Sequence, residues 1–296
     1  MDLDLTPDQQ LLQQTVRRFL ADDGSWNGLV DVGVVGLLAD GGSMVDVGVV
    51  AMETGRALYA GPWVSTAVAA ASLLPDLGDR PAAVTFDGLE FVADACGAEI
   101  LVVIDGDGAT VVEDFTAEPV ATIDPSRAWG RVTATSAGRA LDGVDVGLAR
   151  DRTLAAWVAD GVGAAERVLE MTVDYAKQRV QFDKPIGSFQ AVQHICADML
   201  RTVEQARAGA WYALWACDAA GPDERRRAVA MAQAFASADL PQVGFDAIQV
   251  HGGVGYTWES DVHRYAKRLL TLAQSMGTAD AHLDALASRL FGSLGE

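Results

Sequence analysis

The stretch that decides the fold is YAKQRVQFDKPIGSFQAVQHICADM, residues 175–199. A helical pattern ends at Arg179, and a loop that contains Phe182 leads to the next helix, which opens with Gln190 and Gln193. An arginine beside a helix start suits a phosphate group, because backbone N–H groups and a guanidinium converge there. Phe182 adds a ring that can stack on a flat ligand. The same pattern also fits a solvated loop held by a salt bridge, so these residues alone leave both interpretations open.

A second stretch, QVHGGVGYTWESDVHRYAKR at residues 249–268, carries further polar groups beside glycines. Gly252 and Gly253 leave the backbone bare, so that another surface can approach it closely. Gln249 and His251 place hydrogen-bonding groups directly before the glycine pair. A glycine pair also commonly ends a helix, and His251 fits either a pyrophosphate contact or the cap of that turn.

The residues downstream of the glycines allow two interpretations each. Tyr256 and Trp258 fit either a substrate edge or ordinary packing, and packing is the more common outcome for such a cluster. Arg264, Lys267 and Arg268 recur at i, i+3 and i+4, which indicates a phosphate contact or, more commonly, a solvated basic face.

Long helical patterns surround both stretches. One apolar face runs along the helix after residue 190 at the spacing i, i+3, i+4, i+7. Its members are Val192, Ile195, Cys196, Met199, Leu200 and Val203. Helices of this length with apolar stripes predict a four-helix bundle over residues 150–296.

The N-terminal half predicts two further units. Residues 1–75 are mostly helical, because Thr6-Pro7-Asp8-Gln9 forms a capping box and a second helical pattern, residues 46–63, closes on Gly61-Pro62. Alanine-rich sequence then continues the helical pattern to Leu74. A small β unit is predicted over residues 82–147, where AEILVVIDGDGATVVE indicates a buried strand, an Asp-Gly turn and a second strand. The order is therefore α, β and α bundle, an α+β chain that is mostly α.

Composition excludes several function classes. The chain of 296 residues has a formal charge of −19, which works against binding to nucleic acid or to anionic membranes. The acidic N-terminus lacks the pattern of a signal peptide, and no apolar run has the length of a membrane span, so a cytoplasmic location is expected. Three scattered cysteines and four separate histidines suggest neither a disulfide framework nor a metal site.

Taken together, the two stretches resemble the C-terminal domain of the acyl-CoA dehydrogenase family. RVQFDKPIGSFQAVQHICADM looks like the arginine-and-phenylalanine loop and glutamine-rich helix start of that family, and QVHGGVGYTWE like its glutamine-and-diglycine segment. LTPDQQLLQQTVRRFL and METGRALYAGPW resemble its first helical domain, so the resemblance covers most of the chain. It implies an N-terminal helical domain, a middle β domain and a C-terminal four-helix bundle.

The resemblance also implies a cofactor. In this family FAD lies across a subunit interface, with its adenosine-diphosphate part held by one subunit and its flavin ring lying in the neighbour. The residues implied as FAD contacts are Arg179, Phe182, Gln190, Gln193, Gln249, Gly252 and Gly253. The electron acceptor that the resemblance implies is an electron-transferring flavoprotein.

The chain departs from the family where the reaction needs a base. Removal of the proton α to the thioester requires a carboxylate, which the family places at one of two positions. The resemblance maps these positions onto Met276 and Thr153, and neither residue is a carboxylate. The β region also lacks the family's segments that cover the flavin ring, and Asp280 replaces a glutamine that often touches the cofactor.

These selective losses resemble the small, base-less subunit of the heteromeric α2β2 acyl-CoA dehydrogenases of actinobacterial steroid and cholesterol catabolism. The leading hypothesis is therefore a subunit that binds the FAD tail and works with a catalytic acyl-CoA dehydrogenase subunit on an acyl-CoA. One alternative is a self-sufficient homomer whose base has moved to Asp160 or Asp280. Another is a flavin-free scaffold that stabilises a partner or binds an acyl-CoA without reacting.

Overall fold

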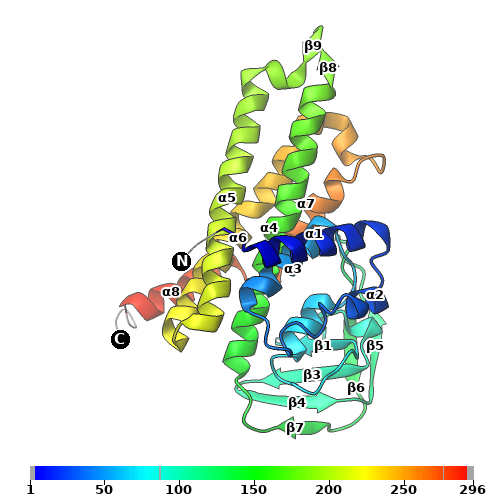
Figure 1. Cartoon of the computed structure of the whole chain (residues 1–296), viewed down its shortest axis with the longest axis vertical. Helices are drawn as coiled ribbons and strands as arrows, with labels where there is room; N and C mark the ends of the chain where they lie inside the picture. The colour runs from blue at the N-terminus through cyan, green and yellow to red at the C-terminus, as the bar shows by residue number, and fades with distance from the viewer. Residues whose placement is uncertain (1–3, 87, 276, 292–296) are drawn as a thin grey trace.

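The computed structural model describes residues 4–86, 88–275 and 277–291, which form a broad body and a long projecting pair of helices (Figure 1). The N-terminal helices lie across the middle of the body, two small sheets form one end of it, and the projection leaves the other. The N-terminal elements are α1 (Pro7–Asp22), α2 (Trp26–Asp31), α3 (Met44–Arg56) and the π-helix η1 (Val64–Ala70).

The capping box predicted at the start of α1 is confirmed. The Thr6 hydroxyl accepts a hydrogen bond from the Gln9 backbone N–H, and the Gln9 side chain accepts one from the Thr6 N–H. These bonds satisfy two backbone donors that a helix start otherwise leaves unpaired.

The second helix ends earlier than predicted. It stops at Arg56 rather than at Gly61-Pro62, because Leu58 adopts a left-handed conformation with φ of 49°. The Tyr59 N–H then bonds to the Thr54 carbonyl, and the Leu58 N–H to the Gly55 carbonyl, which is a Schellman ending. That ending usually carries glycine, so the sequence contained no signal for it.

The β region contains two small sheets and two separate core clusters. One sheet has the order β1-β3-β4-β7 and the other β2-β6-β5. The bounds are β1 Ala82–Thr85, β2 Val92–Ala93, β3 Ile100–Asp105, β4 Gly108–Val112, β5 Phe115–Pro119, β6 Trp129–Ala134 and β7 Arg139–Leu141. The predicted hairpin is β3–β4, in which Asp105 pairs with Gly108 across a two-residue loop.

The C-terminal half is built on one very long helix, α4 (Val146–Gln178), which runs from the sheets to the tip of the projection (Figure 1). Its 33 residues span about 50 Å at 1.5 Å per residue. The other helices are α5 (Gln190–Ala219), α6 (Pro222–His251), α7 (Val262–Gln274) and α8 (Ala279–Phe291). The short strands β8 (Val180–Gln181) and β9 (Lys184–Pro185) close the tip, followed by η3 (Ile186–Ser188), and η4 (Gly252–Tyr256) follows α6.

Two glycines let α3 and α4 cross at very short range. A Cβ at Gly55 would lie 1.8 Å from the carbonyl oxygen of Asp160, and one at Gly163 would lie 1.8 Å from that of Met52. No side chain fits at either position, so this contact locks the N-terminal helices onto α4.

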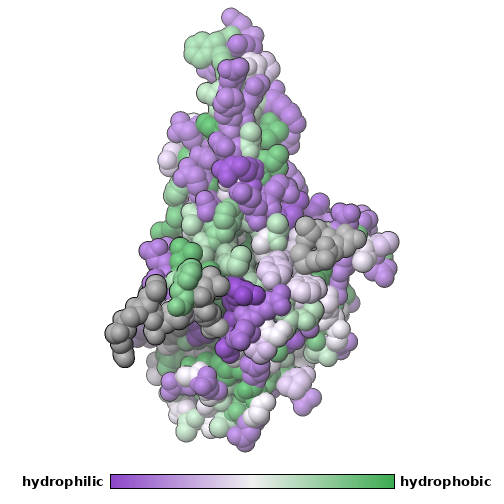
Figure 2. All heavy atoms as spheres, turned by 90° about the vertical axis from the view of Figure 1, so that its left-hand side faces the viewer, coloured by the Kyte–Doolittle hydropathy of each residue, from purple (hydrophilic) through white to green (hydrophobic). Residues whose placement is uncertain are grey.

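The apolar face of α5 is buried only in part. Met199 and Val203 are in the core, whereas Leu200 is half exposed and Val192 and Ile195 are only partly covered. The N-terminal half of α5 lies in the projection, beyond the rest of the body (Figure 1). Figure 2 shows hydrophobic side chains among hydrophilic ones along this narrow end. Among the described helices, none has the length and apolar run needed to cross a membrane.

Candidate cofactor surface and pocket

The two stretches singled out in the sequence lie side by side at the base of the projecting tip. The ring of Tyr175, near the end of α4, stacks on the ring of His251, the last residue of α6, with centroids 4.3 Å apart and planes 20° apart. Arg179 caps α4 one turn beyond Tyr175, and Gly252 caps α6 directly after His251. Helix ends that are far apart in sequence therefore present their caps on the same part of the molecule.

Arg179 and Phe182 are exposed to solvent at the tip. The N–H of Arg179 bonds to the Tyr175 carbonyl, and within the described part of the chain no carboxylate pairs with its guanidinium. The salt-bridged loop considered from the sequence is therefore not formed. Phe182 is 86% exposed and, like Asp183, has a positive φ, so the two-residue turn between β8 and β9 holds its ring outward.

The helix start beside this loop offers free donors. Gln190 begins α5 without a side-chain cap, and the N–H groups of Gln190 and Ala191 donate to no acceptor in the described residues. Gln193 donates from its amide nitrogen to the Gly187 carbonyl at 2.9 Å, which braces the loop. Unpaired N–H groups at a helix start favour an anion.

The glycine segment has two kinds of glycine. Gly252 has φ of 62° and ψ of −140°, which only glycine adopts readily, and Gly255 is needed because a Cβ there would press on Ile248 and His251. Gly253 differs, since a Cβ there would meet nothing within 4 Å. This chain's own packing does not require that glycine, which leaves room for an approaching ligand or partner. Gln249 is exposed beside it.

His251 takes the capping role rather than the ligand role that the sequence left open. Its Nδ1 lies 2.8 Å from the Ala247 carbonyl oxygen and its ring is buried under Tyr175. The two aromatic residues after the glycines contradict the packing interpretation, because Tyr256 and Trp258 are 75% and 77% exposed.

The set as a whole fits the adenosine-diphosphate part of FAD. An unpaired guanidinium, free backbone donors and a bare glycine backbone suit the two phosphates, and an outward phenyl ring suits a flat base. All seven predicted contacts lie in the α4–α5 loop and the start of α5, or at the end of α6 and the start of η4. None of them lines the large pocket described next.

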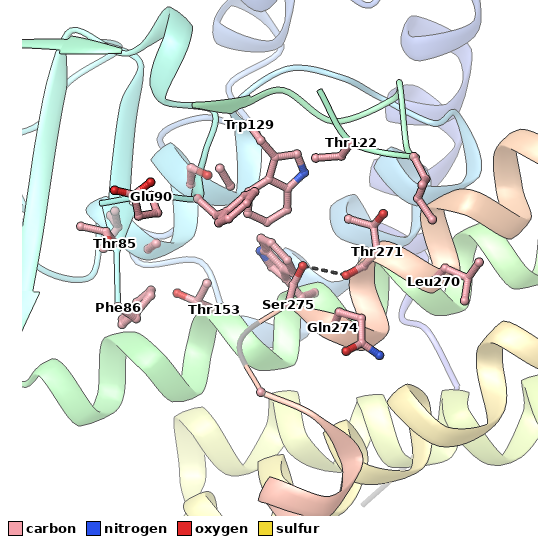
Figure 3. Close-up of a pocket in the computed structure, with 18 residues that line it drawn as sticks. Thr85, Phe86, Glu90, Thr122, Trp129, Thr153, Leu270, Thr271, Gln274 and Ser275 are labelled. Atoms are coloured by element: carbon pink, nitrogen blue, oxygen red, sulfur yellow. Dashed lines mark hydrogen bonds between the residues drawn. The ribbon is translucent and has the colours of Figure 1, made fainter. Parts of the chain in front are cut away.

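That pocket has a volume of about 490 Å³ and lies between the sheets, α4 and the end of α7 (Figure 3). Apart from Glu90, the described residues of its walls are apolar or neutral. Trp129 and Trp157 meet edge to face with ring centroids 6.1 Å apart. Hydroxyl groups of Ser65, Thr85, Thr122, Thr153 and Ser275 are bonded within the protein, as in the bond from Ser275 to the Thr271 carbonyl that Figure 3 draws. Among the described lining residues there is no lysine, arginine or histidine.

One of the two positions onto which the resemblance maps the family's base lies in this pocket. Thr153 is buried in its wall and donates its hydroxyl to the Ala149 carbonyl at 2.7 Å. Met276, the other position, lies outside the described residues. Glu90 is the one carboxylate among the described lining residues, and it is largely exposed and pairs with Arg131 at 2.6 Å.

Neither Asp160 nor Asp280, the two candidates for a relocated base, places a free carboxylate in the pocket. Asp160 has no exposed surface and is held by both oxygens, with Arg268 at 3.0 and 2.8 Å. Arg127 and the Thr54 hydroxyl add contacts at 3.3 and 3.2 Å. Burial opposes ionisation of Asp160, but the two arginines outweigh it and hold its pKa below the ordinary value. Asp280 is exposed in the first turn of α8 and does not line the pocket.

Arg268 corrects the prediction of a solvated basic face. Its guanidinium is buried, and besides Asp160 it donates to the Ser126 and Tyr59 carbonyls at 2.9 and 3.3 Å. It therefore joins α7 to α4, to the loop before β6 and to the end of α3. Only Arg264 and Lys267 of the three basic residues are directed to the surface side, where Lys267 lies over the Trp258 ring.

Sequence reasoning missed a buried acidic residue near this cluster. Asp94 is fully buried with φ of 62°, accepts a short hydrogen bond from Ser65, a pocket-lining residue, and has one oxygen without a partner in the described structure. Burial raises the pKa of the Asp94 carboxyl above its ordinary value, although Arg127 and Ser65 oppose the shift. An isolated aspartate in an irregular loop gives no sequence signal for such a position.

Comparisons with known proteins identify the family of the chain. Residues 144–291 match the model of the acyl-CoA dehydrogenase C-terminal domain. The acyl-CoA dehydrogenase IpdE2 of Mycolicibacterium smegmatis is 36% identical over 261 residues, covering 85% of this chain and 80% of that protein.

Two solved heteromeric structures match nearly the whole chain. A Tcur3481–Tcur3483 steroid acyl-CoA dehydrogenase variant superposes with a TM-score of 0.84 at 25% identity over 96% of this chain and 97% of the other. The ChsE4–ChsE5 complex of Mycobacterium tuberculosis does so with a TM-score of 0.83 at 23% identity over 98% and 99%. The family and fold expected from the two sequence stretches are thereby confirmed, and the chain belongs to the acyl-CoA dehydrogenase family.

Proposed function

We propose that this chain is the non-catalytic subunit of a heteromeric, FAD-dependent acyl-CoA dehydrogenase. It contributes the surface that holds the adenosine-diphosphate part of FAD, while the flavin ring lies in a catalytic partner subunit. The observation that carries the proposal is a separation within one molecule. The cofactor-tail surface consists of Arg179, Phe182, the start of α5 and residues 249–253, and its Arg179 guanidinium and backbone N–H groups have no partner in the described chain. The pocket between the sheets and α4, in contrast, has no free carboxylate among its described residues.

Individual residues have distinct parts in this proposal. Arg179 and the free N–H groups at the start of α5 bind the phosphates, and Phe182 stacks on the adenine. Gln193 keeps the loop in shape through its bond to Gly187. Gln249, Gly252 and Gly253 complete the contact from the end of α6. When bound, FAD supplies the acceptor for the hydride from the β-carbon of the acyl-CoA.

In this proposal the catalytic partner subunit supplies the base that removes the α-proton. Thr153 has a hydroxyl that is already bonded to its own helix, and a methionine stands at position 276. Neither side chain can remove a proton from carbon at neutral pH. The similarity to a solved steroid acyl-CoA dehydrogenase favours a steroid-derived CoA thioester as the substrate. An α2β2 assembly and an electron-transferring flavoprotein as the electron acceptor belong to the proposal through the family resemblance alone.

A flavin absorbance spectrum and the native mass test the proposal directly. The chain is purified alone and again after co-expression with a catalytic acyl-CoA dehydrogenase subunit. We expect flavin absorbance only in the co-purified sample, with one FAD per pair of chains. Full flavin loading and turnover of acyl-CoA by the chain alone would instead show a self-sufficient enzyme. Absence of FAD from the assembled complex would select the flavin-free scaffold.

A further inference from the structure

We propose that Tyr175 and His251 are positioning residues that set the spacing between the arginine loop and the diglycine turn of the cofactor-tail surface. The inference rests on the proposed function, since it concerns how that surface is held ready for FAD. Neither side chain is proposed to contact the phosphates. Their role is to keep Arg179 and Gly252 at a separation that suits one ligand.

The two helix ends need such a contact because they belong to different helices and end in different backbone conformations. Arg179 ends α4 in an extended conformation, and Gly252 ends α6 with a positive φ. A rotation at either cap would change the direction of the segment that follows it. The stacked rings lie one residue from Gly252 and one helical turn from Arg179, with their centroids 4.3 Å apart.

His251 is held in one orientation. The Ala247 carbonyl can only accept a hydrogen bond, so the Nδ1 that lies 2.8 Å from it carries the proton. Burial lowers the pKa of His251, although its bond to Ala247 opposes the shift, and the ring is therefore neutral at physiological pH. One face of the His251 ring then stacks on Tyr175, and the backbone continues from His251 directly into the turn at Gly252.

Tyr175 connects to Arg179 through the backbone as well as through the helix. Its carbonyl accepts the hydrogen bond of the Arg179 N–H at 2.8 Å, the last bond of α4. Displacing the Tyr175 ring from His251 would therefore loosen the same turn that orients the guanidinium. Both rings also line a hollow of about 400 Å³ between α4 and η4, so nothing else in the described chain fills the space beside them.

A double-mutant cycle on the assembled complex tests the inference. The dissociation constant of FAD is measured by flavin fluorescence for Tyr175→Ala, Arg179→Ala and the double variant, together with the unfolding temperature. We expect Tyr175→Ala to weaken FAD binding about tenfold without a matching fall in thermal stability, a coupling of the size seen between residues in contact. In the Arg179→Ala background the same substitution should have little further effect, because the group that it positions is gone.

Three further variants make the result specific. Tyr175→Phe keeps the stacked ring and should bind FAD as the wild type does. His251→Ala should match Tyr175→Ala, since either change removes the stack. Tyr212→Ala removes a tyrosine stacked on Trp215 in the last third of α5 and serves as the matched control, which should leave the FAD constant unchanged.

Two outcomes would overturn the inference, and they are distinguishable. Losses from Tyr175→Ala and Arg179→Ala that simply multiply in the double variant would show that Tyr175 acts independently of Arg179. Unaltered FAD binding in Arg179→Ala itself would overturn the proposed function, and this inference would fall with it.

Discussion

The projecting tip and the pocket between the sheets and α4 treat their polar groups in opposite ways. At the tip the Arg179 guanidinium and two backbone N–H groups point to solvent without partners in the described chain. In the pocket the hydroxyl of Thr153 is paired with its own helix, and behind the walls Asp160 is neutralised by two arginines. Free polar groups are ready for a ligand, whereas paired ones stabilise the fold.

Under the proposed function, this contrast between tip and pocket explains how the chain keeps the cofactor-binding part of an active site without the base. Exposed groups cost the isolated chain little, so the tip can be maintained for a ligand that arrives with a partner. A buried charge without a partner would be expensive, so Asp160 is buried together with two arginines that neutralise it. The following changes break or sharpen this contrast.

The largest effect is expected in the buried ion cluster. Arg268→Ala leaves the Asp160 carboxylate without its main partner in a fully buried site, and should lower the free energy of unfolding by about 3–5 kcal/mol. Urea unfolding measures the change. Arg264→Ala, one turn earlier on α7 and paired with Asp261 near the surface, is the matched control and should change stability by less than about 0.5 kcal/mol. Equal effects of the two would show that the cluster does not hold the fold.

Glycine substitutions separate the helix crossing from the tip. Gly55→Ala forces a methyl group into the Asp160 backbone and should destabilise the protein by about 1–3 kcal/mol or more. Gly253→Ala has open space for its methyl group, so thermal unfolding should be unchanged while FAD binding by the assembled complex weakens. A Gly253→Ala complex that binds FAD normally would argue against a ligand or partner approaching there.

Arg179→Ala should affect only the cofactor. The guanidinium has no carboxylate partner in the described structure, so the unfolding temperature of the chain should not move. Loss of a charge-assisted bond of about 1.5–3 kcal/mol should weaken FAD binding by the complex by about 10- to 100-fold. Flavin fluorescence titration measures it. Arg179→Lys keeps the positive charge but loses the planar guanidinium with its paired donors, so its affinity for FAD should lie between those of the wild type and Arg179→Ala.

The smallest effect is a change in pH dependence at Asp94. Its pKa is raised in the fold, chiefly by burial, so the folded state holds the proton more tightly than the unfolded state does. Ionisation of Asp94 therefore destabilises the fold as pH rises above the ordinary aspartate pKa of about 3.9. Asp94→Asn should be more stable than the wild type at pH 8 and closer to it at pH 4. Unfolding curves at both values check the sign, and the opposite order would mean that Asp94 works as a paired carboxylate.

Local signals predicted the elements well, and tertiary contacts account for the differences. The capping box at Thr6 is a four-residue pattern, and its prediction is confirmed. The end of α3 was placed too late because Leu58 takes a left-handed turn that glycine usually provides. Its conformation is held from a distance, by the Tyr265 hydroxyl on the Arg56 carbonyl and by Arg268 on the Tyr59 carbonyl.

The sequence by itself determined the family, the order of helices and strands, and the residue types of the cofactor-tail surface. These depend on short-range spacing, such as a loop between two helix ends or a glycine pair after a helix. Only the tertiary structure decided which of those groups are free. Arg179 and Arg268 are both arginines on helical segments, yet one is exposed without a carboxylate partner in the described chain and the other is buried on Asp160. The difference arises because burial and pairing depend on residues more than a hundred positions away, which no local pattern records.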